Sequence, residues 1–300
     1  MTGLHVGIDI GGTKVLAGEV SDEGKVVRTA LRRTPGRHAD PQALDDAVTS
    51  ALDEIAGGRA VAGVGLSVAG LVDRSGQRVR FSTHLPWQED DTSDRLSLRW
   101  GVPVVMANDV TCAALAELRF GAGRAHEDFL LITVGTGLGG ALVQGGRLML
   151  GANGMAGEFG HTRVVPDGRD CECGLRGCLE EYASGNALVR LAGPSYDDGQ
   201  SVTAAASDGD PLALQALASV GEWLGVGLAG LVGAFDPAVV LVGGGVADAG
   251  ELLLKPTRRA LARSVVGAGH RELPELLLAE CGPPAGMIGA AHLSLSRTRH

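Results

Sequence analysis

Four residues in the middle of the chain have the types and spacing of a zinc site. Cys171, Cys173 and Cys178 fall within the segment CECGLRGCLE, and His161 lies ten residues before the first of them. Three thiolates and one imidazole complete a tetrahedral Zn²⁺ shell with no position left for water, as in structural sites. The opening residues MTGLHVGIDI predict a strand rather than a secretory signal, and in the cytoplasmic protein that we therefore expect, clustered cysteines favour a metal over disulfides. The sequence therefore predicts a structural zinc ion on these four residues.

Two acidic residues flank this predicted metal site. Glu158 lies three residues before His161, and Glu180 lies two residues after Cys178. Carboxylates that accept hydrogen bonds from neighbouring hydroxyls are a common means of holding a sugar. Acidic residues are more often plain surface residues than ligands, but the position of these two beside the metal favours a role in binding.

A first glycine turn lies near the amino terminus, in DIGGTK (residues 9–14). Backbone N–H groups in such a turn can point together at an anion, and Thr13 and Lys14 add a hydroxyl and a positive charge. Asp9, at the end of a strand, could hold a water bound to Mg²⁺, because hard cations prefer oxygen ligands. The motif is neither a P-loop nor a dinucleotide fingerprint, and a purely structural hairpin stays open as the alternative.

A second glycine turn, GTGLGG (residues 135–140), superficially matches the dinucleotide pattern GxGxxG. That pattern should open a helix, whereas ALVQGGRL after these glycines is typical of a strand. With Thr136 placed to donate its hydroxyl, the segment fits a second phosphate clamp better than a dinucleotide site.

Asn108 and Asp109 end the apolar strand pattern PVVMAND, just before a predicted helix. An aspartate there could accept the proton of a substrate hydroxyl that attacks a phosphoryl group. Asp and Asn are also good helix N-caps, so capping is the competing interpretation.

Strands alternate with helices along the chain, which predicts an α/β fold. Apolar periodicity predicts helices over residues 41–56, 110–120, 211–235 and 285–297, and strands that include residues 5–10, 15–20 and 238–242. The strand–turn–strand pattern of residues 129–147 repeats that of residues 5–20, which suggests two related lobes. We expect a small lobe of residues 1–108, with the helix of residues 285–300 packing back on it, and a large lobe of residues 109–284.

The bulk composition narrows the functional classes. The chain has 300 residues and a net charge of −9, which argues against general binding to nucleic acid. No apolar stretch of about 18 residues is evident, so we expect a cytoplasmic protein that does not span a membrane. Cys112 and Cys281 lie in apolar segments and are expected to be ordinary buried residues.

The motifs DIGGTK, ND, TVGTGLGG, GEFGH, CxCGxxGCxE and VGGGV occur in the order found in ROK sugar kinases. Over nearly the whole chain the sequence resembles this family, and is most similar to its actinobacterial-type glucokinases. The resemblance implies a two-lobed actin-like ATPase (ribonuclease H-like) fold with a ligand cleft between the lobes. It also implies glucose phosphorylation with ATP, Mg²⁺ and structural Zn²⁺ in glycolysis, by a homodimer or homotetramer.

The resemblance assigns roles to individual residues. Asp109 would be the base that deprotonates the sugar 6-hydroxyl. The sugar would be held by Asn108, Glu158, His161, Glu180 and Gly70. ATP and Mg²⁺ would be held by Asp9, Gly11, Gly12, Thr13, Lys14, Gly135, Thr136, Gly137, Gly244 and Gly245. His161 would bind zinc as well as sugar, together with Cys171, Cys173 and Cys178.

Two alternatives remain open at this stage. Many relatives carry Asn in an N-[IL]-x-W segment that contacts the sugar, whereas this chain has His84 in HLPW. The first alternative is therefore a kinase with a different substrate. Its sugar would be another hexose or an N-acetylhexosamine (fructose, N-acetylglucosamine or N-acetylmannosamine), or its phosphoryl donor would be polyphosphate. A sugar-sensing repressor of the same family is the second. It is disfavoured because such proteins carry a DNA-binding region before the first strand, and Asp9 lies close to the start.

Overall fold

The computed structural model describes residues 3–89 and 91–298, and for residues 297 and 298 the backbone alone. The chain forms two compact units. Unit 1 comprises Met1–Arg124, Leu148–Ala156 and Pro283–His300, and unit 2 comprises Ala125–Arg147 and Gly157–Gly282. Each unit contains one five-stranded sheet, so both are α/β.

The sheet of unit 1 is mixed, with a hairpin at one edge. Its order is β3 (Val26–Arg33), β2 (Lys14–Val20), β1 (Leu4–Ile10), β4 (Val61–Val68) and β7 (Val104–Asn108). Strands β1 and β2 pair antiparallel, whereas β1, β4 and β7 run parallel. The carboxyl ends of three parallel strands therefore lie at one edge of this sheet, where ligands of open α/β sheets bind. A separate two-stranded ribbon joins β5 (Leu71–Val72) and β6 (Val79–Phe81).

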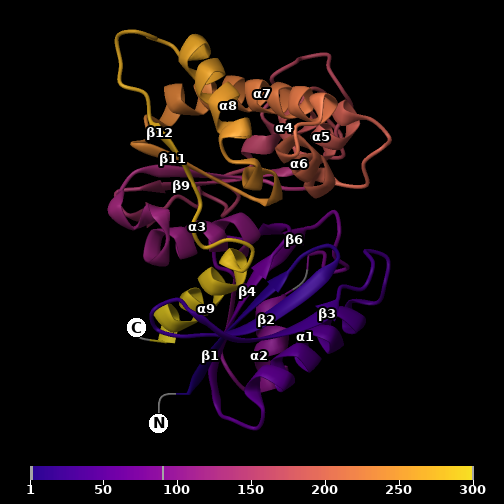
Figure 1. Ribbon diagram of the computed structural model, residues 1–300. Helices are drawn as coiled ribbons and strands as arrows, with labels where there is room; N and C mark the ends of the chain where they lie inside the picture. The colour runs from indigo at the N-terminus through magenta and orange to yellow at the C-terminus, as the bar shows by residue number, and fades with distance from the viewer. Residues whose placement is uncertain (1–2, 90, 299–300) are drawn as a thin grey trace. The chain divides into compact units, whose positions relative to one another are not determined.

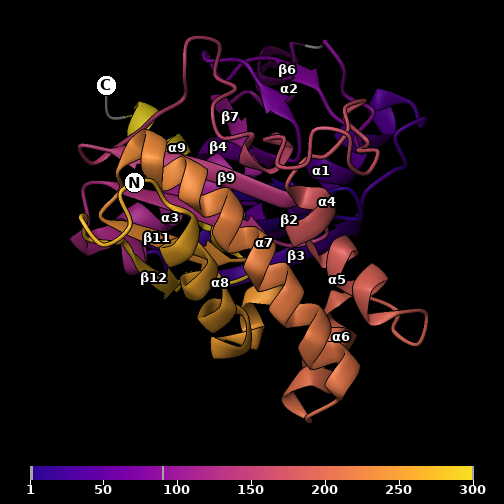
Figure 2. The same ribbon diagram turned by 90° about the horizontal axis from the view of Figure 1, so that it is seen from above.

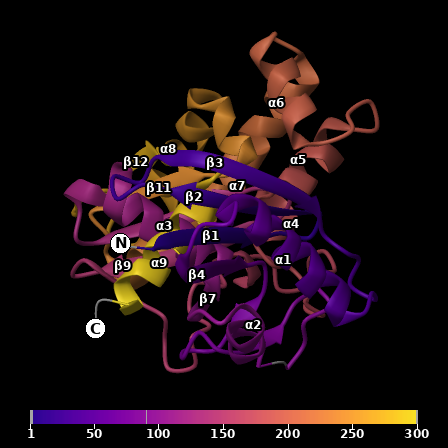
Figure 3. The same cartoon turned by 90° about the horizontal axis from the view of Figure 1, so that it is seen from below.

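Helices cover both faces of this sheet. Helices α1 (Pro41–Ala56) and α2 (Thr92–Trp100) cover one face, and α3 (Asp109–Phe120) and α9 (Ala285–Thr298) cover the other (Figures 1 and 3). Helix α1 begins where Asp40 accepts a hydrogen bond from the backbone N–H of Gln42, and it ends at Gly57 in the left-handed conformation. The apolar stripe that predicted this helix is buried against the sheet.

The sheet of unit 2 repeats the pattern of unit 1. Its order is β10 (Arg147–Leu148), β9 (Leu138–Gln144), β8 (Phe129–Val134), β11 (Val239–Gly243) and β12 (Glu275–Leu278). Strands β8 and β9 form an antiparallel hairpin, and β8, β11 and β12 run parallel. The internal repeat expected from the sequence is thus present in the strand topology, with each glycine turn joining the two strands of a hairpin.

Most helices of unit 2 follow the β8–β9 hairpin. They are α4 (Glu180–Ala183), α5 (Gly185–Ala192), α6 (Gly199–Ser207), α7 (Pro211–Phe235) and α8 (Glu251–Ser264), with single 3₁₀ turns at η2 (Phe159–His161) and η3 (Gly245–Ala249). A further 3₁₀ turn, η1 (Ala122–Ala125), lies where the chain passes from unit 1 to unit 2. Figure 2 shows α7 running beside α8, with α5 and α6 near its first turns.

Helix α7 corrects one sequence expectation. By length and composition alone it could cross a membrane, although no such stretch was expected, but 61% of its apolar window is buried inside the protein. Its apolar side chains join the core of unit 2, with Leu224 and Leu228 fully buried. Burial of this extent is what the core helix of a soluble protein shows.

The predicted elements agree closely with those in the structure. Helices α1 and α7 have the predicted bounds, while α3 and α9 differ by one residue at an end. The predicted lobe boundary and the compact units differ at α3: that helix packs against α9 and lies in unit 1, whereas residue 109 was expected to open the large lobe.

Helix α9 packs so closely against the sheet of unit 1 that the strand facing it needs glycine at the contact. A Cβ atom on Gly65, in the middle of β4, would collide with the backbone carbonyl of Ala290. We expect Gly65→Ala to lower the free energy of unfolding by about 3 kcal/mol. This is the upper end of the usual cost of overpacking a core, because a backbone carbonyl cannot move aside as easily as a side chain. Gly36→Ala is the control, since a Cβ there meets nothing within 4 Å, and we expect a change below about 1 kcal/mol. Urea unfolding of both variants measures the difference, and equal midpoints would contradict the close contact.

Candidate functional site

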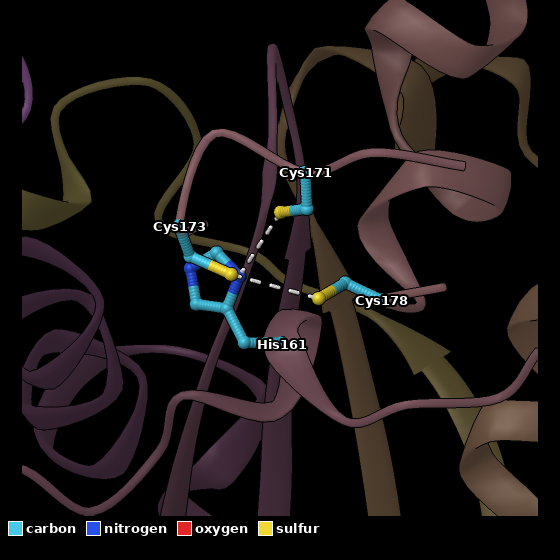
Figure 4. Close-up of side chains that lie close together, drawn as sticks. All are labelled: His161, Cys171, Cys173 and Cys178. Carbon is cyan, nitrogen blue, oxygen red and sulfur yellow. Dashed lines mark hydrogen bonds between the residues drawn. The ribbon is translucent and has the colours of Figure 1, made fainter. Parts of the chain in front are cut away.

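The four predicted zinc ligands converge in unit 2 (Figure 4). Their ligand atoms all lie within 4.8 Å of one another. Cys173 Sγ is 3.7 Å from Cys178 Sγ, and Cys171 Sγ is 3.6 Å from His161 Nδ1. A tetrahedral Zn²⁺ with ordinary bond lengths separates two sulfurs by about 3.8 Å, and a sulfur from a nitrogen by about 3.6 Å. The donor set and these two spacings fit a zinc ion.

The loop that carries the cysteines is held by its own backbone. Arg163 and Cys178 form one isolated antiparallel bridge, and Asp170 and Arg176 form another. The hydroxyl of Tyr182, in α4, accepts a hydrogen bond from the backbone N–H of Arg169 at 2.9 Å. These contacts bring Cys171, Cys173 and Cys178 into one turn, although Cys173 remains exposed. None of the five cysteines, all of which lie in the described part of the chain, forms a disulfide, so the three thiols of the cluster remain available to a metal.

His161 has a different neighbour on each side of its ring. Nδ1 faces Cys171 and lies 3.3 Å from Glu180 Oε1, while Nε2 lies 3.8 Å from Glu158 Oε2. One nitrogen can therefore bind a metal while the other remains available to a ligand. Desolvation raises the pKa of Glu158, with a smaller contribution from the charge of Glu180, while His161 opposes the shift. The structure thus brings Glu158, His161 and Glu180 together, as the sequence predicted.

Glu180 also connects the metal cluster to the second glycine turn. Its Oε1 lies 3.1 Å from Cys171 Sγ, and its Oε2 accepts a hydrogen bond from the backbone N–H of Leu138 at 3.4 Å. A Cβ atom on Gly137 would lie only 2.9 Å from the same Oε2. One carboxylate therefore touches both the metal loop and the turn predicted to bind phosphate.

The second glycine turn is fastened to the start of α5. The N–H groups of Gly185 and Asn186 donate to the carbonyls of Gly135 and Thr136, at 2.7 and 3.2 Å. Strand β9, not a helix, follows the turn, so the dinucleotide interpretation is wrong. Thr136 is exposed at its tip.

Gly244 and Gly245 follow β11, next to the strand that leads into this turn. Gly244 has φ of 84°, and a Cβ atom there would lie 2.5 Å from the carbonyl oxygen of Val134. The end of β8 and the turn after β11 are therefore neighbours, because β8 and β11 pair in parallel. The glycines predicted to border the nucleotide and those of the second glycine turn therefore lie together in unit 2.

In unit 1 the structure distinguishes the roles of Asn108 and Asp109. Asn108 is the N-cap of α3, since its Oδ1 accepts hydrogen bonds from the N–H groups of Val110 and Thr111 at 2.9 and 3.2 Å. Its Nδ2 donates to the carbonyl of Gly70 at 3.1 Å. Asp109 is the first residue of the helix and half-buried. Asn108 is therefore the N-cap of α3, while Asp109 Oδ1 also accepts a hydrogen bond from the Val110 N–H at 2.9 Å.

The first glycine turn joins β1 to β2 at the same edge of the sheet. The Gly11 N–H donates to the Lys14 carbonyl at 3.0 Å, and the hydroxyl of Thr34 donates to the Gly11 carbonyl at 2.7 Å. Gly12, Thr13 and Lys14 are exposed. The base of this turn is thus fixed by hydrogen bonds, while the residues at its tip are exposed to solvent, as an anion-binding turn requires.

Asp9, just before this turn, lies in a largely buried environment. Burial raises its pKa, while a hydrogen bond from Ser67 and the charge of Lys14 act in the opposite direction. The Ser67 Oγ lies 2.5 Å from Asp9 Oδ1. The sequence marked Ser67 only as the start of SVAGLVD (residues 67–73), a segment that departs slightly from the usual family pattern at the expected sugar pocket, and gave its hydroxyl no role of its own.

His84 lies beside the first glycine turn. A Cβ atom on Gly12 would lie 2.9 Å from the Cβ of His84. The neighbouring Leu85 and Trp87 are fully buried, and the Trp87 indole donates to the buried carboxylate of Asp45 at 3.0 Å. His84 is therefore an exposed side chain on a firmly anchored segment, next to a turn for which the sequence predicts phosphate binding.

A model of the ROK family matches residues 5–297. The chain belongs to the ROK family. Its curated relatives include the glucokinase of Streptomyces coelicolor, 39% identical over 97% of this chain and 98% of that protein. An N-acetylgalactosamine kinase of Shewanella is 33% identical over 97% of the chain and 96% of its own length.

Solved structures agree with this assignment. A ROK family glucokinase from Streptomyces griseus, crystallised with glucose and AMPPNP, is 40% identical and superposes with a TM-score of 0.90 over 98% of this chain and 100% of that one. The predicted fold class, the actin-like ATPase fold built of two α/β lobes, is thereby confirmed.

Proposed function

We propose that this ROK protein transfers the γ-phosphoryl group of ATP to the 6-hydroxyl of glucose. The observation that carries the proposal is the set of His161, Glu158 and Glu180 beside a thiolate cluster that fits zinc. The chain that presents them is 40% identical, over nearly its full length, to a glucokinase crystallised with glucose and AMPPNP.

The side chains of unit 2 bind the sugar hydroxyls. Glu158 and Glu180 accept hydrogen bonds, and His161 uses Nε2 while Nδ1 faces the metal ligands. A bound zinc ion would be structural, fixing the loop and the tilt of the imidazole ring. Asn108 and Gly70 of unit 1, already joined by a hydrogen bond, contribute further polar contacts.

Asp109 accepts the proton of the attacking 6-hydroxyl. Asp109 is half-buried at the first position of α3, where the helix N-terminus favours a negative charge. The phosphoryl group then passes to the sugar oxygen, and ADP leaves.

The two glycine turns bind the nucleotide. Unit 1 contributes Gly11, Gly12, Thr13 and Lys14, and unit 2 contributes Gly135, Thr136, Gly137, Gly244 and Gly245. Mg²⁺ bound with ATP would neutralise charge on its phosphates, and Asp9 would hold a water of that ion. Exposed backbone at the tip of the first turn and the positive charge of Lys14 support this assignment.

A panel of sugars and donors tests the proposed reaction. We expect kcat/KM with ATP and glucose to exceed that with fructose, N-acetylglucosamine, N-acetylmannosamine and N-acetylgalactosamine by at least about tenfold, since one mismatched buried hydrogen bond costs about 1–3 kcal/mol. Coupled detection of ADP measures each sugar, and detection of glucose 6-phosphate measures polyphosphate as donor. Equal values for glucose and the other sugars would refute the assignment of the substrate.

One observation favours a second candidate, a kinase for an N-acetylhexosamine. The chain is 33% identical to an N-acetylgalactosamine kinase over almost all of its length, and His84 occupies the segment where many ROK kinases carry a sugar-binding Asn. The same panel separates the two. A sugar-responsive repressor would instead shift operator DNA in a gel without phosphorylating any sugar.

The remaining expectations belong to the same proposal. A soluble protein is supported by the burial of α7, and we place the enzyme in the cytoplasm. We propose a homodimer or homotetramer, a role at the entry to glycolysis, and no binding to nucleic acid or membrane. Light scattering on the purified protein measures the oligomeric state.

A further inference from the structure

The carboxylate of Asp9 is fixed from one side by a single buried hydroxyl. Asp9 and Ser67 are opposite each other in the register of β1 and β4. Ser67 is fully buried, and its Oγ donates to Asp9 Oδ1 at 2.5 Å. A distance at the short end of the range for O–H···O⁻ bonds indicates a charge-assisted interaction.

The surroundings of Ser67 leave its hydroxyl little freedom. A Cβ atom on Gly286, in the first turn of α9, would lie 2.6 Å from Asp9 Oδ1 and 2.7 Å from Ser67 Oγ. Cys112, in α3, is buried as well, and its Sγ lies 4.0 Å from the carbonyl oxygen of Leu66, the residue before Ser67. Helices α3 and α9 therefore both pack near the Ser67–Asp9 pair, and the backbone of α9 comes so close at Gly286 that no side chain fits there.

This packing distinguishes the two oxygens of Asp9. Oδ1 is occupied by Ser67, and within residues 3–89 and 91–298 no hydrogen bond to Oδ2 is present. The carboxylate thus presents one oxygen in a set direction while the other is tied to the sheet. This arrangement suits a ligand that donates a hydrogen bond to an oriented oxygen. A water molecule bound to a hydrated cation is such a ligand.

We propose that Ser67 is a positioning residue, which orients the Asp9 carboxylate toward the hydrated Mg²⁺ of the bound nucleotide. The inference rests on the proposed function, since it takes Asp9 as the group that meets Mg²⁺. Ser67 itself touches neither the sugar nor the nucleotide. It acts by holding one oxygen of Asp9, as outer partners of metal sites hold the groups that contact the ion.

Calorimetric titration of AMPPNP, with and without Mg²⁺, tests the proposal without any turnover. For Ser67→Ala we expect the Mg²⁺-dependent gain in AMPPNP affinity to fall by about 10–100-fold, the range for outer partners of metal sites. Affinity for AMPPNP in EDTA and affinity for glucose should stay within about twofold of the wild type, because the glycine turns and the sugar ligands are unchanged.

Ser93→Ala is the matched control. Ser93 is also buried in unit 1, and its hydroxyl donates to the carbonyl of Val104 at 2.6 Å, but it lies in α2. Both variants lose one buried hydrogen bond, and only Ser67→Ala should lose the Mg²⁺ effect. If Ser67→Ala does not fold, Ser67→Cys replaces it, since a thiol keeps the volume but is a weak donor.

Three results would overturn the proposal. They are an unchanged Mg²⁺ effect in Ser67→Ala, an equal loss of AMPPNP affinity with and without Mg²⁺, and an equal loss of the Mg²⁺ effect in Ser93→Ala. The proposed function fails separately, if the wild type binds Mg²⁺ and AMPPNP but phosphorylates no glucose.

Discussion

Replacing Asp109 by asparagine should lower kcat for glucose phosphorylation by about 10²–10⁴, the usual contribution of a general base. Glucose affinity should change by less than about threefold, because the amide keeps the size of the carboxylate and can still hydrogen-bond a hydroxyl. Steady-state kinetics give kcat, and calorimetry gives glucose affinity without turnover.

The structure indicates that Asp109→Asn keeps the start of α3 intact. Asn108 Oδ1 accepts hydrogen bonds from the N–H groups of Val110 and Thr111. The Val110 N–H also donates to Asp109 Oδ1 at 2.9 Å, and the amide oxygen of the substituted side chain can accept that bond as well. Asp94→Asn is the matched control, since Asp94 is also acidic in the first turn of a helix, α2, and is exposed. It removes the same charge and should leave kcat unchanged. Near-wild-type turnover in Asp109→Asn would refute the base, and a loss of glucose affinity as large as the loss of turnover would make Asp109 a binding residue.

Sequence periodicity was sufficient for the elements but not for their contacts. The apolar stripe of residues 41–56 and the apolar run of residues 211–235 specified two helices with the bounds found in the structure. Each pattern can be recognised within a short stretch of sequence. A helix that buries one face shows a periodic apolar stripe, and a helix buried on all sides shows a continuous apolar run. The same run also shows the limit: composition alone does not reveal that α7 lies in the core of unit 2.

The candidate site was predictable where its residues are close in sequence. Cys171, Cys173 and Cys178 must lie near one another in any compact fold, whereas the pair of Ser67 and Asp9 depends on the register of two strands 58 positions apart. Asn108 and Asp109 are adjacent and both cap helices well, so only backbone geometry could separate their roles. Sequence reasoning therefore found the cysteine–histidine cluster and missed the contact between Ser67 and Asp9.

Removing the metal should have effects beyond the metal loop. We expect one zinc per chain in the purified protein, and its loss in Cys178→Ser should lower glucose turnover by more than about 100-fold, beyond what outer partners of metal sites contribute. Zinc binding to small peptides is worth about 10–16 kcal/mol, so a loop without it loses its main constraint. Glu158, His161 and Glu180 would then no longer be held in one geometry.

The contacts of Glu180 extend this expectation to the nucleotide. Its carboxylate lies against Cys171 and accepts a hydrogen bond from Leu138 in the second glycine turn, so a disordered metal loop releases that turn as well. AMPPNP affinity should therefore fall in Cys178→Ser and after treatment with a chelator, and added Zn²⁺ should restore the chelated protein. Cys281→Ser, outside the cluster, is the control and should keep both metal and turnover. Metal analysis and calorimetry decide: a zinc-free protein with full turnover would refute the metal site, whereas lost glucose affinity with unchanged AMPPNP affinity would show that Glu180 does not couple the two.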